Sequence, residues 1–166
     1  VSHGKIKILI YLTYQLIGET EMTNKTDLFT SLHKESICFG ETKDCAVKAV
    51  AIVLNITYAD AHARLKARGR KNGCGTSTLM IHEVIRAAGK QLQWTPQESI
   101  TAKYPGKHSQ KKIVTTNQPD RFHKAWADGK TYLMYTPGHV LAVVNGVNHD
   151  WTRGKSKQCS SLYEII

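Results

Sequence analysis

The chain of 166 residues is long enough for one domain with a hydrophobic core and too short for two ordinary domains. Its hydrophobic share of 41% and charged share of 22% are those of a globular protein and exclude a disordered or low-complexity chain. The formal charge of +10 favours acidic partners, whether nucleic acid, an anionic surface or an acidic polypeptide.

The N-terminal residues 6–17 alternate apolar and polar side chains with the period of a strand and are too short and too polar for a membrane span. Lys5 and Lys7 precede an apolar run, as in a signal peptide, but no small-x-small cleavage site follows. A more ordinary sequence begins at Met22, so we treat residues 1–21 as an N-terminal extension whose role is left open and residues 22–166 as a single domain. In that domain a short helix is expected first, over residues 27–32.

The four cysteines show no Cys-x-x-Cys pair and no His-x-x-x-His companion, so the spacing of a structural zinc site is absent. We expect neither a metal nor a cofactor. An even number of cysteines would allow two disulfides in a secreted protein, but a core of this size does not need them. We expect reduced thiols and a cytoplasmic setting, with secretion left open.

Residues 45–54 predict a helix that belongs in the core, because Lys48 is the only polar residue after Cys45. Asp44 or Thr42 can accept hydrogen bonds from the first free backbone N–H groups of this helix. Cys45 then lies in the first turn, where the helix dipole and the unpaired N–H groups lower the pKa of a thiol. The alternative interpretation of this cysteine is a small buried hydrophobic residue.

Two further helices are predicted before residue 90. A capping box over 57–60 begins one of them, and His62 on its apolar face is interpreted as a packing residue rather than a ligand. Thr76 or Ser77 caps the other helix, which Gly89 ends. The apolar face of that helix is expected to comprise Leu79, Ile81, Val84, Ile85 and Ala88.

A glycine-rich cationic loop, residues 68–76, connects these two helices. Such loops before helices can bind phosphate, but this one lacks the Gly-Lys-Ser/Thr ending of a P-loop. We interpret it as a basic surface loop that contacts an acidic protein or nucleic acid through Arg68, Arg70 and Lys71. A second basic region follows at Lys103, Lys107, Lys111 and Lys112.

The second half of the chain is dominated by strands. Residues 91–116 show a weaker pattern, and residues 118–127 suggest a short helix. Beyond Gly129 four strands are predicted, over 131–135, 139–144, 147–151 and 161–165. Helices followed by an antiparallel sheet indicate an α+β fold, with the buried central helix packed on a C-terminal antiparallel β-sheet.

Asn145-Gly146, between two of these strands, is a strong hairpin signal and predicts a two-residue type I′ turn. That turn pairs Val144 with Val147. Paired residues share a face of the sheet, as do residues two apart along a strand. One face then carries His139, Leu141, Val143, Asn148, Asp150 and Thr152.

On this face Asp150 is the diagonal neighbour of His139, close enough for a carboxylate to hold an imidazole. Asn148 lies nearer the turn and is the alternative orienter, while His149 points to the opposite face. A β-bulge would reverse this choice. Together with Cys45, the pattern predicts a nucleophile, base and orienter, and the alternative interpretation is an ordinary surface pair.

A cysteine at the start of a buried helix, followed far downstream by Gly138-His139 and an acidic residue on the next strand, resembles the papain-like cysteine peptidase superfamily. The compact bacterial and phage members, including the double-glycine leader peptidases of bacteriocin exporters, are the most similar. Residues 44–49 and 69–71 are also similar to phage proteins associated with that superfamily. The resemblance covers roughly residues 36–166.

The resemblance implies a papain-like fold and a Cys-His-Asp triad. Cys45 would be the nucleophile, His139 the general base and acid, and Asp150 the orienter. A phage protein of this kind would work in the cytoplasm of its host.

The oxyanion hole is where the chain departs from the family. Such enzymes usually carry a Gln a few residues before the cysteine, whereas residues 36–44 contain neither Gln nor Asn. The Cys45 backbone N–H would supply one donor, and Thr42, Lys43 or a neighbouring backbone N–H the other. Loss of one such donor costs on the order of 10²–10³ in rate, so a weak or inactive enzyme is an alternative.

The leading hypothesis is a cysteine hydrolase, either a peptidase, an isopeptidase or an amidase, that acts on a peptide or protein substrate through an acyl-enzyme. One alternative is a papain-like scaffold that is weak or inactive as an enzyme and binds nucleic acid or an acidic protein through its basic surface. Another is a transferase that passes the same acyl group to a nucleophile other than water.

Overall fold

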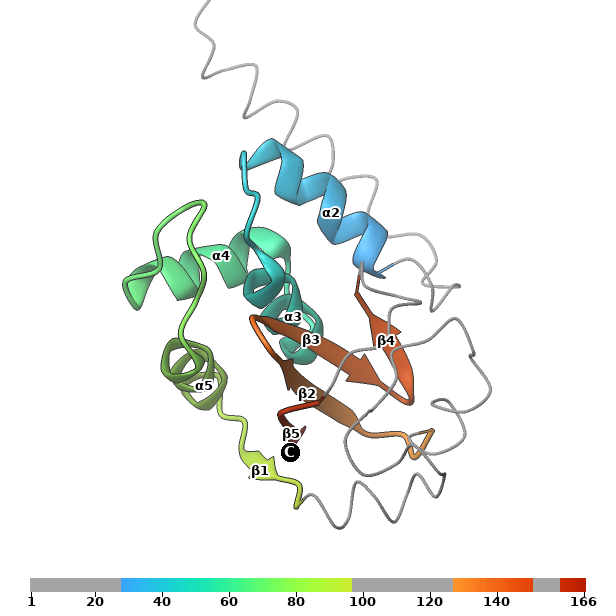
Figure 1. Ribbon diagram of the computed structural model, residues 1–166. Coiled ribbons are helices and arrows are strands. Elements are labelled where there is room, and N and C mark those ends of the chain that lie inside the picture. The colour runs from blue at the N-terminus through green and yellow to red at the C-terminus, as the bar shows by residue number, and fades with distance from the viewer. Residues whose placement is uncertain (1–27, 97–126, 151–158) are drawn as a thin grey trace, which may run out of the picture.

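The computed structural model describes residues 28–96, 127–150 and 159–166 (Figure 1). The helices of this part are α2 (Leu28–Cys38), α3 (Cys45–Leu54), α4 (Tyr58–Ala67) and α5 (Thr78–Ala87). The strands are β1 (Leu92–Trp94), β2 (Thr131–Thr136), β3 (His139–Val144), β4 (Val147–His149) and β5 (Ser161–Ile165). The expected N-terminal strand, the second basic region and nearly all of the helix expected over 118–127 lie outside the described residues.

The strands form one antiparallel sheet in the order β1-β5-β2-β3-β4. Strands β2, β3 and β4 follow one another along the chain, whereas β5 lies between β1 and β2. Helices followed by an antiparallel sheet confirm the predicted α+β class.

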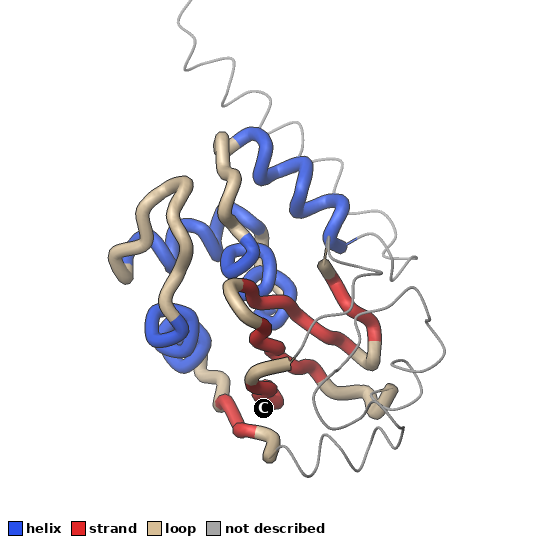
Figure 2. The backbone as a smooth tube through the Cα atoms, in the orientation of Figure 1, coloured by secondary structure: helices blue, strands red, loops and turns tan. Residues whose placement is uncertain are grey.

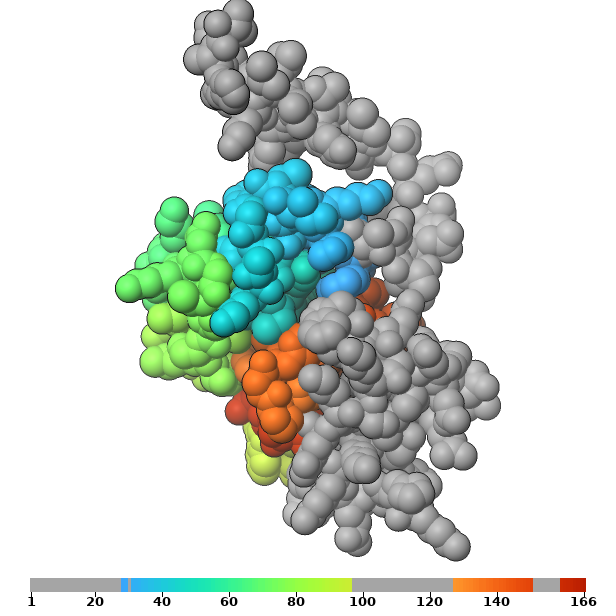
Figure 3. Space-filling model, turned by 45° about the horizontal axis from the view of Figure 1, so that its top comes forward, coloured from blue at the N-terminus to red at the C-terminus, as the bar shows by residue number. Residues whose placement is uncertain are grey.

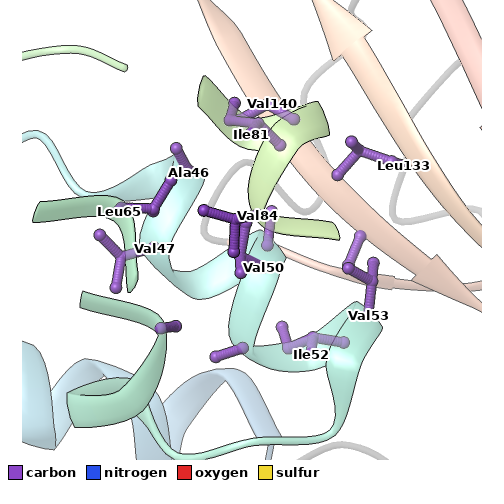
Figure 4. Packing of buried hydrophobic residues seen from close by; sticks show 14 of the residues in the cluster. Ala46, Val47, Val50, Ile52, Val53, Leu65, Ile81, Val84, Leu133 and Val140 are labelled. Atoms are coloured by element: carbon purple, nitrogen blue, oxygen red, sulfur yellow. The ribbon is translucent and has the colours of Figure 1, made fainter. Parts of the chain in front are cut away.

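Helix α3 is the central element, since it contacts α2, α4, α5 and strands β2 and β3. All of its residues from Ala46 to Val53 are buried. Figure 4 shows Val47 and Val50 of this helix among side chains from the neighbouring helices and strands. The prediction that α3 is a core helix is confirmed, with Cys45 as its first residue.

The sheet is covered on both faces. Leu133, Val140 and Ala142 pack in the main core with α3. A second cluster lies on the other face and comprises Tyr132, Met134, Leu141, Val143, Cys159 and Leu162. Strands β2 and β3 are therefore buried on both faces and form a rigid platform beside α3.

Several helix boundaries follow local signals. The Thr57 hydroxyl accepts a hydrogen bond from the Asp60 backbone N–H at 3.1 Å, as the capping box predicts. Ser77 caps α5 by accepting from the Met80 N–H. Gly89, just beyond α5, has a φ of 78°, a conformation that favours glycine.

Other boundaries differ from the predictions. Helix α2 extends to Cys38 instead of ending near residue 32, and its buried Leu32 and Ser36 lie one helical turn apart. The short strand β1 was not predicted, because its three residues show little pattern of their own and, among the described strands, pair with the distant β5. Strand β4 ends at His149, two residues earlier than predicted.

The predicted apolar face of α5 is wrong at Leu79, which is 64% exposed. Residues four and seven positions later on a helix share a face, and here these are Glu83 and Arg86. Leu79 therefore lies on the charged side of α5, while Ile81 and Ile85 face the core.

Candidate active site

Cys45 is half-buried at the first position of α3. Burial alone would raise the pKa of this thiol, but a hydrogen bond with His139 and the backbone N–H groups of Val140 and Ala46 outweigh burial. The pKa of Cys45 consequently lies below its ordinary value. Buried Cys159 shows the opposite behaviour, since burial raises its pKa to about 12.

His139 begins β3 and connects two groups. Its Nε2 lies 2.8 Å from Oδ2 of Asp150, and both side chains are largely buried. Because Nε2 faces Asp150, Nδ1 is the ring nitrogen left for its hydrogen bond with Cys45. Burial opposes protonation of the ring, but hydrogen bonds with Asp150 and Cys45 outweigh it and raise the pKa of His139 to about 9.

The β3–β4 hairpin brings His139 and Asp150 together. Asn145 and Gly146 have φ values of 47° and 77°, as a type I′ turn requires. Val144 pairs with Val147, Val143 with Asn148 and Ala142 with His149, so the register runs without a bulge along the paired residues. The predicted turn and register are confirmed.

Asn148, the alternative orienter, lies on the predicted face, but its Oδ1 is buried and has no hydrogen-bond partner in the described part of the chain. His149 pairs with Ala142, whose side chain belongs to the main core, so His149 lies on the opposite face as predicted. Of the two candidates, Asp150 is the one that contacts the imidazole.

Asp44 is the residue before α3, but its side chain makes no capping hydrogen bond. Its carboxylate accepts from Lys48 Nζ and from the Tyr58 hydroxyl, each at 3.0 Å. The prediction that Asp44 caps α3 is therefore wrong. Instead, Lys48 and the distant Tyr58 bind the two carboxylate oxygens, and the Ala46 N–H is among the groups that stabilise the Cys45 sulfur.

The predicted basic surface loop must be corrected at Arg70. The Arg70 side chain is fully buried and pairs with the equally buried Glu41 at 2.7 Å. Arg68 and Lys71 are exposed, and Arg68 pairs with Glu83 at 3.2 Å. The guanidinium of Arg70 thus has a partner inside the protein and is not presented to an acidic one.

The proposed second oxyanion donor, Thr42, is exposed in the bend before α3. Cys45 opens the helix, so its own N–H belongs to the first turn, which has no earlier carbonyl in the helix to bind. The roles of Thr42 and of the Cys45 N–H stay predictions.

The sequence did not reveal the partners of Glu41. His62 Nε2 lies 2.8 Å from Glu41 Oε1, in addition to the contact with Arg70. Sequence patterns gave one usable signal, since His62 falls on the buried face of α4. The pairing itself joins residues far apart in the chain, which no local pattern shows.

Within residues 28–96, 127–150 and 159–166, no group of three or more His, Cys, Asp or Glu side chains is placed to hold a metal ion. None of the helices in that part of the chain is long and apolar enough to cross a membrane.

On the face shown in Figure 3, the cyan segment between α2 and α3 adjoins the orange strands. The Cys45–His139 hydrogen bond joins the first residue of α3, which directly follows that segment, to the first residue of β3. Comparisons of the chain with protein-family models, curated proteins and solved structures each return no match. The functional argument below therefore depends on the geometry of the site.

Proposed function

We propose that this protein is a cysteine hydrolase that cleaves an amide bond of a peptide, isopeptide or related acyl substrate, on a papain-like scaffold. The observation that supports the proposal is the continuous series from Cys45 through His139 to Asp150. It combines a thiol of lowered pKa, an imidazole beside it and a carboxylate that fixes the imidazole, as nucleophilic catalysis requires.

In the first half of the reaction the Cys45 thiolate attacks the carbonyl carbon of the substrate. The resulting oxyanion is stabilised by backbone N–H groups at the start of α3. When the C–N bond breaks, the imidazolium of His139 gives its proton to the leaving amine. The acyl group remains on Cys45 as a thioester.

In the second half His139 takes a proton from water, and the hydroxide formed attacks the thioester. The C–S bond breaks, Cys45 leaves as a thiolate and the acid product departs. The sum is an amide and water converted to an amine and a carboxylic acid. An amine in place of water would give acyl transfer through the same thioester.

Thiol reactivity tests the proposal. Iodoacetamide at neutral pH should alkylate Cys45 faster than the exposed Cys38 and Cys74, because the thiolate is the reacting form. Buried Cys159, whose pKa is raised, should react last. Peptide mapping by mass spectrometry over time assigns each rate.

Two variants complete the experiment. In His139→Ala, Cys45 should no longer be alkylated faster than the exposed Cys38 and Cys74. Cys45→Ser should abolish the stoichiometric burst of nitrophenol that formation of an acyl-enzyme gives with p-nitrophenyl acetate. Alkylation of Cys45 no faster than Cys38 and Cys74, together with no burst, would favour a structural cysteine and sink the proposal.

A further inference from the structure

The carboxylate of Glu41, four residues before Cys45, is bound by four donors. Arg70 Nη1 and Nη2 donate to its two oxygens at 2.7 and 3.0 Å. His62 Nε2 lies 2.8 Å from Oε1, and the Gly73 backbone N–H donates to Oε2 at 2.9 Å. The Glu41 and Arg70 side chains are both fully buried. The pKa of Glu41 is lowered to about 2, chiefly by the hydrogen bond from Arg70.

Arg70 also holds the chain on either side of this ion pair. Its Nη2 donates to the Lys43 carbonyl at 3.3 Å, and its Nε donates to the Thr76 hydroxyl at 3.1 Å. One guanidinium thus links the α2–α3 connection, residues 39–44, to the α4–α5 loop, residues 68–77. Figure 2 shows these two connections in tan, and the hydrogen bonds place them side by side.

This anchoring matters because it reaches the exposed middle of the bend before α3. Thr42 and Lys43 are exposed, so no apolar side chain ties them to the core. Gly40, just before them, has a φ of 65° and lies in open space. The approach to the first residue of α3 is held by the contacts of Glu41 and Lys43 with Arg70, and by those of Asp44 with Lys48 and Tyr58.

A buried ion pair is weak evidence for a role in stability, since desolvation offsets most of the attraction between the two charges. The pair fixes the position of the Glu41 carboxylate, because a guanidinium that donates to both oxygens permits only a narrow range of carboxylate positions. Arg70 restrains both the Glu41 side chain and the Lys43 carbonyl, which lies two residues before Cys45.

We infer that Glu41 and Arg70 are positioning residues that hold residues 41–44, and through them Cys45, in the geometry that reaction requires. This inference rests on the proposed function. The Glu41–Arg70 pair acts through the backbone of residues 41–44 and contacts neither the substrate nor the Cys45 sulfur. Its expected effect is on the alignment of Cys45 with His139 and with the Ala46 N–H, the groups that stabilise the thiolate.

Two conservative variants test the inference. Arg70→Lys keeps the charge but cannot reach Glu41 and the Lys43 carbonyl together, and Glu41→Gln turns an amide NH₂ toward donors. We expect the rate of Cys45 alkylation at pH 7 to fall on the order of tenfold or more, because small misplacements of reacting groups are costly. The pH midpoint of the alkylation rate should rise in both variants.

The pH midpoint of Cys45 alkylation distinguishes a positioning role from a role in stability. It reports the pKa of the thiol in folded molecules and does not depend on what fraction of the sample is folded. Glu83→Gln is the matched control: it breaks the exposed pair between Arg68 and Glu83 and should leave the midpoint unchanged. Thr76→Val removes only the Nε contact and should give a smaller change in the same direction. Circular dichroism confirms folding of each variant at the temperature used.

Midpoints equal to wild type in folded Arg70→Lys and Glu41→Gln would overturn the inference and leave the proposed function intact. If neither variant folds, the midpoint of Thr76→Val decides in the same way. A wild-type Cys45 that reacts no faster than Cys38 and Cys74 would instead refute the proposed function, and the positioning role would fall with it.

Discussion

Oδ2 of Asp150 lies 2.8 Å from Nε2 of His139, across a hairpin whose two strands are joined by Asn145 and Gly146. A carboxylate at this distance fixes the ring orientation and stabilises the imidazolium. It also directs Nδ1 toward Cys45. The hairpin thus brings together two side chains that are 11 positions apart in the chain.

Replacement of Asp150 by Asn should separate geometry from charge. The fold should persist, while the rate of acyl-enzyme formation should fall by on the order of 10²–10⁴, because the amide lacks the negative charge that stabilises the imidazolium and can turn its NH₂ group toward the ring. The burst with p-nitrophenyl acetate measures this rate, with a thermal melt to confirm folding.

Asn148→Ala is the control for Asp150→Asn. Its Oδ1 is already buried without a partner in the described residues, so its removal should cost little stability and little activity. A silent Asp150→Asn with a crippling Asn148→Ala would make the orienter an amide and contradict the assignment.

The charge state of the site predicts a pH window for the first reaction step. The pKa of Cys45 is lowered and that of His139 is raised to about 9, so thiolate and imidazolium coexist in a window whose upper limit is about pH 9. Acylation should fall in acid as the thiolate is protonated, and above about pH 9 as the imidazolium that protonates the leaving amine is lost.

A pH–rate profile of acylation with an amide substrate or amide probe, measured for wild type and Asp150→Asn, checks this window. Since the contact with Asp150 raises the pKa of His139, the alkaline limb of the variant should move to lower pH. An alkaline limb that stays in place would mean that another group titrates there.

The restraint on Asp44 gives a third prediction. Tyr58→Phe removes one of the donors that fix the position of the Asp44 carboxylate. We expect the carboxylate to move toward the helix N-terminus, where its negative charge raises the pKa of Cys45. The alkylation midpoint should rise, and stability should fall by about 2 kcal/mol for the lost hydrogen bond to a charged group.

Tyr132→Phe is the control for Tyr58→Phe. It removes another tyrosine–aspartate hydrogen bond, 2.6 Å to Asp128, on the sheet face away from α3. The free energy of unfolding of Tyr132→Phe should fall, while the pH midpoint of Cys45 alkylation should stay at the wild-type value. Equal midpoint changes in the two variants would show that the effect is not local to Asp44.

A fourth prediction concerns acid stability. The pKa of Glu41 is about 2 when folded and 4.5 as a free side chain, so its contribution is present above pH 4.5 and is lost as the pH falls toward 2. The loss should amount to about 3 kcal/mol. Urea unfolding at a series of pH values should give a flatter curve for Glu41→Gln than for wild type or Glu83→Gln, and parallel curves would contradict the assignment.

Local signals were sufficient for the parts of the site that lie on one hairpin or one helix start. Asn145-Gly146 sets the register, and the period of two along β3 and β4 then places Asp150 beside His139. The helix beginning at Cys45 followed from a run of apolar residues without Gly or Pro. In both cases the deciding interactions join residues close in sequence.

Predictions failed where long-range contacts decide. Arg70 was predicted to be a surface cation because Arg68 and Lys71 lie in the same loop. Its burial depends on the pair with Glu41, which is 29 positions earlier in the chain. Asp44 had the right residue type for a cap, but Tyr58 competes for its carboxylate. Strand β1 has little pattern of its own and depends on pairing with β5.

The position of β5 between β1 and β2 also sets an order of events in folding. During synthesis β1 leaves the ribosome well before β2, yet β5, its strand partner in the described part of the chain, emerges after all the other described strands. Until then β1 lacks the strand it pairs with in the described sheet, and the edge of β2 that β5 will cover is open to pairing with another chain.

The hairpin that carries His139 can form early because its contacts are local, but closing the sheet must wait for residues 161–165. Slow, concentration-sensitive refolding is the expected consequence. Leu162→Pro, within β5, should prevent this strand from pairing and cause the protein to aggregate during refolding.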